Sequence, residues 1–355
     1  MLYKKDWTET KQRLDSFWNG KYIGRPCVAI YAQDKKANVS PPELPLSDED
    51  RYLNIDWFLK NLEYRFSNTA YIAEALPSDS VMAGYTLSYR ASVKFNPTTV
   101  WIEPVEDIDV EDEKTFDLDL ESKEIKKFFN FYNRFVQAGS KKFLIGQPAI
   151  LPGHDLLSML MGSGKFLIGL IDNSVAMKSA IMKLAENWVL INKKIIEIYK
   201  EYQEGYGICW LALWCPYSFV STQSDISCML SKEMFEQFII PEIEMVCREF
   251  KTVVYHLDGP GALHHLDRLC KIPEIQMIQW VPGAGSTYSV REWLWLYKKI
   301  QDSGKKVMAY VMPEEVEFFI KNLDAKLSYI VCNCKTRKNA EHLLINIEKW
   351  SGAKI

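Results

Sequence analysis

Short apolar runs alternate along this chain with longer segments in which apolar residues recur at helical spacing. The alternation is regular from residue 122 onward, and short apolar strands between helices indicate βα units whose parallel strands are buried on both faces. Pro241 should kink or split the helix in which it falls, because proline lacks the backbone N–H. The pattern predicts helices over about 122–138, 174–203, 232–250, 261–270, 290–303, 313–322 and 336–349, and strands over 143–145, 209–214, 253–256, 277–280, 307–310 and 329–332.

The first part of the chain adds a helix and two further strands. Residues 1–24 read as a helical lead-in, in which Trp7 and Trp18 fall close to one helical face. Apolar runs over 26–32 and 71–74 predict strands, the second ending at a glutamate.

Seven or eight such units without a dinucleotide-binding fingerprint favour a TIM (β/α)8 barrel. We therefore predict one α/β barrel domain over 1–355 with the helical extension over 1–24 at its start. A doubly wound sheet is the alternative.

Composition and charge exclude several classes of protein. Of 355 residues, 48% are hydrophobic and 25% charged, as in globular domains. The 43 basic and 46 acidic residues leave a formal net charge of −3, which gives no argument for a nucleic-acid partner or an anionic membrane. The N-terminus is charged and no long apolar run follows, so we expect a cytoplasmic protein with no membrane association, whose eight cysteines are thiols or metal ligands.

Candidate site residues follow from the barrel prediction, because barrel enzymes act at the carboxyl ends of their strands. Trp214, Trp280 and Tyr310 would line an apolar mouth, and His154 lies just beyond a predicted strand. The side chains expected at the strand ends are Glu74, Gln147, Trp214, His256, Asp258, Trp280, Tyr310, Cys332 and Cys334.

The segment around His256 and Asp258 carries the strongest chemical pattern. On an extended chain, residues two apart point to the same side, and imidazole and carboxylate both bind zinc. Cys332 and Cys334 are also two apart at a strand end, so a zinc site with these four ligands is geometrically possible. The alternative is that His256 is a hydrogen-bonding pocket residue and the cysteines are buried thiols.

Several segments together resemble the uroporphyrinogen decarboxylase superfamily, in order and spacing over nearly the whole chain. This resemblance implies a TIM barrel with a deep pocket at the strand ends. The segments are 96–104 (NPTTVWIEP), 154–157 (HDLL), 172–173 (DN), 224–225 (SD), 230–235 (LSKEMF) and 255–259 (YHLDG).

Within the superfamily the chain is closer to the corrinoid-dependent methyltransferases than to true decarboxylases. That branch binds zinc through a His-x-Cys pair and a later cysteine, where this chain has His256-x-Asp258 and then Cys332 or Cys334. The resemblance implies a zinc-dependent methyltransferase that moves a methyl group between a corrinoid, carried by a partner protein, and a small thiol, hydroxyl or methylated substrate. Glu74 is a possible further ligand.

Two other functions stay open. A metal-free uroporphyrinogen decarboxylase would use Asp225 or Asp258 to bind pyrrole N–H groups. Its arginine-rich loop is reduced here to Arg25, although polyanion recognition needs several guanidinium groups. The third possibility is a non-catalytic barrel that binds a small ligand.

Overall fold

The computed structural model describes residues 1–34, 39–82, 84 and 91–352, and its centre is a seven-stranded sheet. The strand order is β2-β1-β11-β10-β9-β8-β7; all neighbours are parallel except β2, which runs antiparallel to β1. The strands of this sheet are β1 (Cys27–Gln33), β2 (Thr69–Ala73), β7 (Phe219–Gln223), β8 (Thr252–Asp258), β9 (Ile275–Val281), β10 (Lys306–Tyr310) and β11 (Ser328–Cys334). Two small antiparallel pairs accompany it: β3 (Val93–Phe95) with β4 (Val100–Ile102), and β5 (Tyr206–Ile208) with β6 (Leu213–Cys215).

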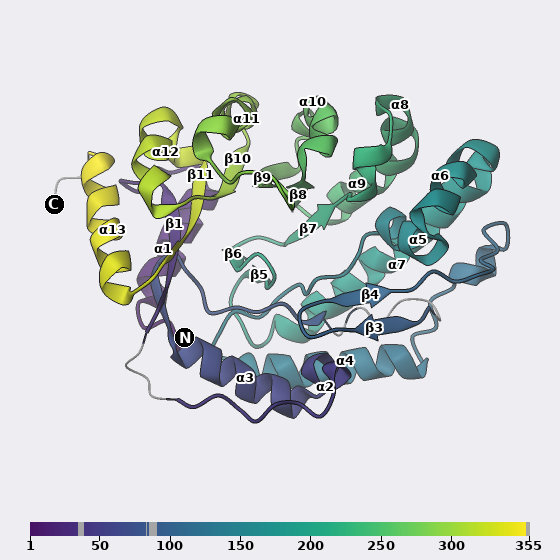
Figure 1. Ribbon diagram of the computed structural model, residues 1–355, viewed down its shortest axis with the longest axis horizontal. Coiled ribbons are helices and arrows are strands. Elements are labelled where there is room, and N and C mark those ends of the chain that lie inside the picture. The colour runs from purple at the N-terminus through teal and green to yellow at the C-terminus, as the bar shows by residue number, and fades with distance from the viewer. Residues whose placement is uncertain (35–38, 83, 85–90, 353–355) are drawn as a thin grey trace.

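Helices surround the sheet. Figure 1 shows α9 to α13 along one side of the molecule and α3, α4 and α7 along the opposite side. No helix in the described part of the chain has the length and apolar character needed to cross a membrane. The helices are α1 (Trp7–Trp18), α2 (Asp48–Leu53), α3 (Ile55–Ser67), α4 (Lys123–Gly139), α5 (Gly153–Met161), α6 (Ser163–Asp172), α7 (Ser174–Tyr199), α8 (Lys232–Met234), α9 (Ile240–Glu249), α10 (Leu266–Cys270), α11 (Val290–Asp302), α12 (Val316–Asn322) and α13 (Arg337–Trp350).

The strands predicted over 253–256, 277–280, 307–310 and 329–332 form as β8 to β11, and the lead-in helix forms as α1. The strand β7 was not predicted, because it lies beyond the predicted run over 209–214. The prediction of eight parallel strands closed into a barrel is not met: among the described strands, the hydrogen-bonded ladder ends at β2 and β7. Residues 143–145, predicted as a strand, form none, and the chain nearby contributes an isolated bridge from Gln147 to Ile208. The run over 209–214 is not one strand either, because the chain turns at Ala212, whose φ is +51°, and β6 runs back along β5.

Pro241 splits its helix as predicted. A π-helical turn over Phe235–Ile239 separates α8 from α9, and the proline stands in the first turn of α9, where no intrahelical N–H bond is lost.

Alternation along the strands divides the core into two layers. Side chains that face the surrounding helices include Ile30, Tyr255, Leu257, Trp280, Ala309, Ile330 and Cys332. Side chains on the inner, concave face include Ala29, Val254, Met277, Met308, Tyr329 and Val331. Polar residues on the inner face near the carboxyl ends of the strands therefore point toward the centre of the molecule, where they can contact one another.

A buried ion pair fixes the amino ends of the strands. Glu74 is fully buried, and Arg25 donates to its two carboxylate oxygens at 2.6 and 2.9 Å. Arg13 of α1 and the backbone N–H of Val28 donate to the same carboxylate at 2.7 and 2.8 Å. Burial alone would raise the pKa of Glu74, but the two guanidinium groups outweigh it and lower the pKa.

We predict that Glu74→Gln lowers the free energy of unfolding by about 3–5 kcal/mol, because it leaves the buried Arg25 charge uncompensated. Urea denaturation of wild type and variant measures this difference. Glu204→Gln is the matched control, since it breaks an exposed pair with Lys11 that solvent screens, and should change stability little. Equal losses in the two variants would contradict a structural role for the Glu74 cluster.

Candidate functional site

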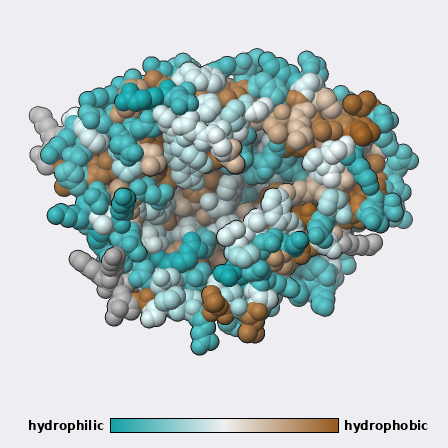
Figure 2. All heavy atoms as spheres, in the orientation of Figure 1, coloured by the Kyte–Doolittle hydropathy of each residue, from teal (hydrophilic) through white to brown (hydrophobic). Residues whose placement is uncertain are grey.

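Three ionisable side chains meet at the carboxyl ends of β7 and β8. Asp225, His256 and Asp258 each offer a donor atom, and these atoms all lie within 4.8 Å of one another. The cause is the parallel register, which pairs Gln223 with His256 and carries both chains forward by two residues to Asp225 and Asp258. Because residues two apart share a face, both members of β8 point to the inner side. Figure 2 shows a hollow at the centre of this face of the molecule.

The His256 ring is held in one orientation by the neighbouring strand. Its Nδ1 contacts Oε1 of Gln279, which is its register partner on β9. An amide oxygen only accepts hydrogen bonds, so Nδ1 carries the proton and Nε2 presents its lone pair. Burial lowers the pKa of His256 against the raising effects of Gln279 and Asp258, which favours the neutral ring.

The two carboxylates of this cluster repel each other, and one of their oxygen atoms has no partner. Asp258 Oδ1 is buried and has no hydrogen-bond partner. Asp225 reaches solvent, but desolvation and the negative charges of Asp155 and Asp258 raise its pKa to about 7, with His154 opposing. A bound cation would relieve this repulsion and supply the partner that Asp258 Oδ1 lacks, so the residues present fit a metal site.

A layer of buried polar groups positions Asp225 from behind. Asp155 of α5 accepts hydrogen bonds from the backbone N–H groups of Asp225 and Ile226 at 2.9 and 3.1 Å. Beside it, His154 Nδ1 contacts Glu242 Oε2 at 2.5 Å, and both side chains are fully buried. Burial alone would lower the pKa of His154, but Glu242 and Asp155 outweigh it and raise the pKa to about 9.

A chain of contacts leads from Gln147 through Ser221 and Trp210 to His256. Gln147 Oε1 accepts from the backbone N–H of Ser221 at 2.7 Å and from the Ser221 hydroxyl at 3.1 Å. The same hydroxyl accepts the indole N–H of Trp210 at 2.8 Å. Trp210 then packs edge-to-face on the His256 ring, with centroids 5.2 Å apart. Gln147 thus acts on the site through the placement of Trp210.

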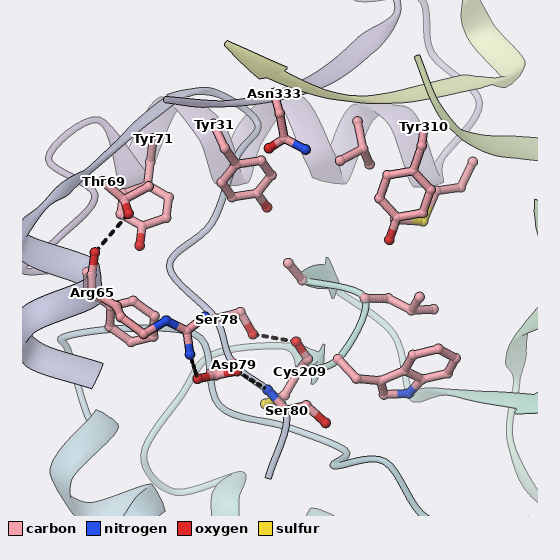
Figure 3. Close-up of a pocket in the computed structure, with 16 residues that line it drawn as sticks. Tyr31, Arg65, Thr69, Tyr71, Ser78, Asp79, Ser80, Cys209, Tyr310 and Asn333 are labelled. Atoms are coloured by element: carbon pink, nitrogen blue, oxygen red, sulfur yellow. Dashed lines mark hydrogen bonds and ion pairs between the residues drawn. The ribbon is translucent and has the colours of Figure 1, made fainter. Parts of the chain in front are cut away.

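A cavity of about 420 Å³ adjoins this cluster through Trp210. It lies on the inner face between β1, β2, β10 and β11, and Tyr310 is among its walls, as the sequence predicted for the mouth. Figure 3 shows the hydroxyl groups of Tyr31, Tyr71 and Tyr310 pointing into the same space.

Four predicted site residues lie elsewhere for two reasons. Glu74 and Trp214 are at the amino ends of the strands, because β2 and β6 run in the reverse direction; the Trp214 carbonyl accepts the indole N–H of Trp18 at 2.7 Å. Trp280 faces outward and packs on Trp293 of α11 at 5.0 Å between centroids. Cys332 also lies in the outer layer.

The two cysteines stay apart from the cluster at His256. Both thiols are free, and the Cys332 S–H donates a hydrogen bond to the sulfur of Cys334. Burial raises the pKa of Cys332 to about 12, which disfavours the thiolate that binds metal. Asn333, the residue between them, faces the cavity instead. The described residues that could together hold a metal ion are therefore Asp225, His256 and Asp258.

Sequence reasoning missed several residues of this site. Trp210 was missed because the strand predicted over 209–214 was expected to end at Trp214. The chain instead turns at Ala212, so Trp210 and not Trp214 lies near the site. Gln279 and Asp155 act on the cluster from a neighbouring strand and from α5, and Glu242 reaches His154 from α9. The HD pair over 154–155 was a signal for the second of these, whereas no local pattern marks Glu242.

The comparisons bear on the fold. No protein-family model matches the chain, and no curated protein matches it in sequence. The structure is similar to that of a methyltransferase from Methanosarcina mazei, with a TM-score of 0.61 and 10% sequence identity over 96% of this chain and 98% of that one. At this identity the likeness establishes a shared α/β fold over almost the full length of both chains.

The buried pair of His154 and Glu242 predicts a pH-dependent stability. The folded pKa of His154, about 9, lies above its ordinary value of 6.5, so its contribution is complete below pH 6.5 and is lost as pH rises through 9. The difference in unfolding free energy between wild type and His154→Gln should therefore shrink from pH 6 to pH 9.5. Urea titrations across this range measure it, and parallel pH profiles for the two proteins would contradict the assignment.

Proposed function

We propose that this protein is a zinc-dependent methyltransferase whose metal is held by Asp225, His256 and Asp258. The single observation that carries the proposal is the meeting of these three donor groups at the carboxyl edge of the sheet, where Asp258 Oδ1 is buried without a partner. The fold shared with a methyltransferase supports the reaction class.

The donor set suits zinc. One imidazole nitrogen and two carboxylate oxygens are accepted zinc ligands, and three protein ligands are the number found in catalytic sites that keep one position open. When bound, the metal supplies positive charge that lowers the pKa of a coordinated thiol or hydroxyl.

The chain's own residues prepare this site. Gln279 holds Nδ1 of His256, which leaves the lone pair of Nε2 available to a metal ion, and such partners tune ligand basicity. Gln223 donates to Asp225 Oδ2 at 2.9 Å, which leaves Oδ1 of that carboxylate free. Trp210 packs edge-to-face on the His256 ring and so helps to hold its position.

The methyl carrier is part of the same proposal. Following the superfamily resemblance, we propose that a corrinoid held by a partner protein exchanges the methyl group with a small substrate. The hollow seen in Figure 2 gives such a carrier access to the inner face. Arg25 is committed to Glu74 at the opposite end of the sheet, so it is not placed to bind the carboxylates of a porphyrinogen in the hollow.

Metal content is the first test. We expect about one zinc per wild-type chain, purified without chelator and measured by elemental analysis, and loss of that zinc in His256→Ala. Cys334→Ser is the control: it removes a thiol from the original four-ligand prediction, and should keep the metal. Zinc retained in His256→Ala, or no zinc in wild type after zinc is supplied, would overturn the proposed site.

Methyl transfer is the second test. Wild type should demethylate methylcobalamin in the presence of a small thiol such as 2-mercaptoethanol, followed by the change in cobalamin absorbance. His256→Ala and Asp258→Ala should lose at least tenfold in rate, while the surface variant Glu204→Gln should not. Full activity in a variant shown to lack metal would rule out the mechanism.

A further inference from the structure

We propose that the cavity beside Trp210 is the substrate site and that it takes an uncharged aromatic ring bearing oxygen, either a phenol or its methyl ether. This inference rests on the proposed function, because it names the small molecule that the same site would methylate or demethylate.

The position of the cavity links it to the metal-ligand cluster. Trp210 lines the cavity, and its ring also packs on His256. Its indole N–H is already donated to Ser221, so this side chain offers the cavity an apolar ring and no free donor. A ligand seated against Trp210 would contact the indole ring that packs on His256, and it would displace none of the three donor groups, because none of them is among the described walls of the cavity.

The size of the cavity suits a small ring. Its volume is about 420 Å³, whereas one water molecule takes up roughly 30 Å³ in the liquid. A benzene ring with one or two substituents therefore fits. Phe66 and Trp210 supply aromatic surface against which such a ring can pack at favourable edge or offset angles.

The polar side of the cavity is rich in neutral donors. The hydroxyls of Tyr31, Tyr71 and Tyr310 point into it from β1, β2 and β10 (Figure 3). Burial raises the pKa of each, so all three keep their protons and can donate. The matching ligand carries oxygen acceptors, as a phenol and a methoxyarene both do.

The charge balance of the cavity argues against an ionic ligand. Arg65 and Asp79 are the charged residues among its described walls, and they form an ion pair with each other. An anion would have to compete with Asp79 for Arg65, and a cation would have to compete with Arg65 for Asp79. A neutral ligand avoids both costs.

Isothermal titration calorimetry with 2-methoxyphenol tests the proposal. Wild type should bind it, and should bind choline and benzoate at least tenfold more weakly. Tyr310→Phe removes one hydroxyl and should weaken binding about tenfold, the factor that corresponds to one hydrogen bond of about 1.4 kcal/mol. Tyr202→Phe, a surface hydroxyl outside the cavity, is the matched control and should bind as wild type does.

Binding of 2-methoxyphenol can be tested independently of whether the protein binds zinc. Binding is measured again after chelator treatment, and 2-methoxyphenol should bind to the metal-free chain. Retained binding in a protein that never holds zinc would refute the proposed function and leave this substrate site standing. Absence of binding to wild type, equal affinities of Tyr310→Phe and wild type, or preferred binding of choline or benzoate would each overturn the substrate site, whatever the metal content.

Discussion

Burial of a parallel sheet on both faces is the constraint on which this structure depends. Successive residues of a strand point alternately to the outer and the inner layer, so the layer of a side chain is fixed by its position along the strand. His256 and Asp258 share the inner face for this reason, while Leu257 between them packs outward. The same rule separates Cys332, in the outer layer, from Asn333 in the cavity wall. Local alternation thus decides which polar groups can ever meet.

The register between neighbouring strands determines which side chains of the same layer lie side by side. The pairing of Gln223 with His256 brings Asp225 level with Asp258, although 33 residues separate them along the chain. Asp155 then holds the backbone at Asp225 by two N–H bonds, and Gln279 holds the ring of His256. The geometry of the cluster therefore comes from strand pairing and from buried hydrogen bonds, and not from mobile loops alone.

The sequence could predict those features that depend on local pattern. Alternation identified β8 to β11 and placed His256 and Asp258 on one face, and Pro241 marked a real interruption, whereas β7 was not predicted. The direction of a strand is not a local property, so Glu74 was expected at the wrong end of the sheet. A single positive φ at Ala212 turned the predicted strand into a hairpin and put Trp210 where Trp214 was expected. Outward-facing Trp280 and Cys332 differ from their inward neighbours by one residue, a distinction that needs the register.

The ion pair at Glu74 and the donor groups at His256 occupy opposite ends of the sheet: the first lies at the amino end of β1, the second at the carboxyl ends of β7 and β8. The side chains that stabilise the fold at Glu74 are therefore different from those that offer donor groups at His256. Descendants of such a chain can exchange the residues at one rim, and with them the reaction, while the buried charges at the other end continue to hold the fold. The arrangement gives natural selection a scaffold in which new activities arise without a matching loss of foldability.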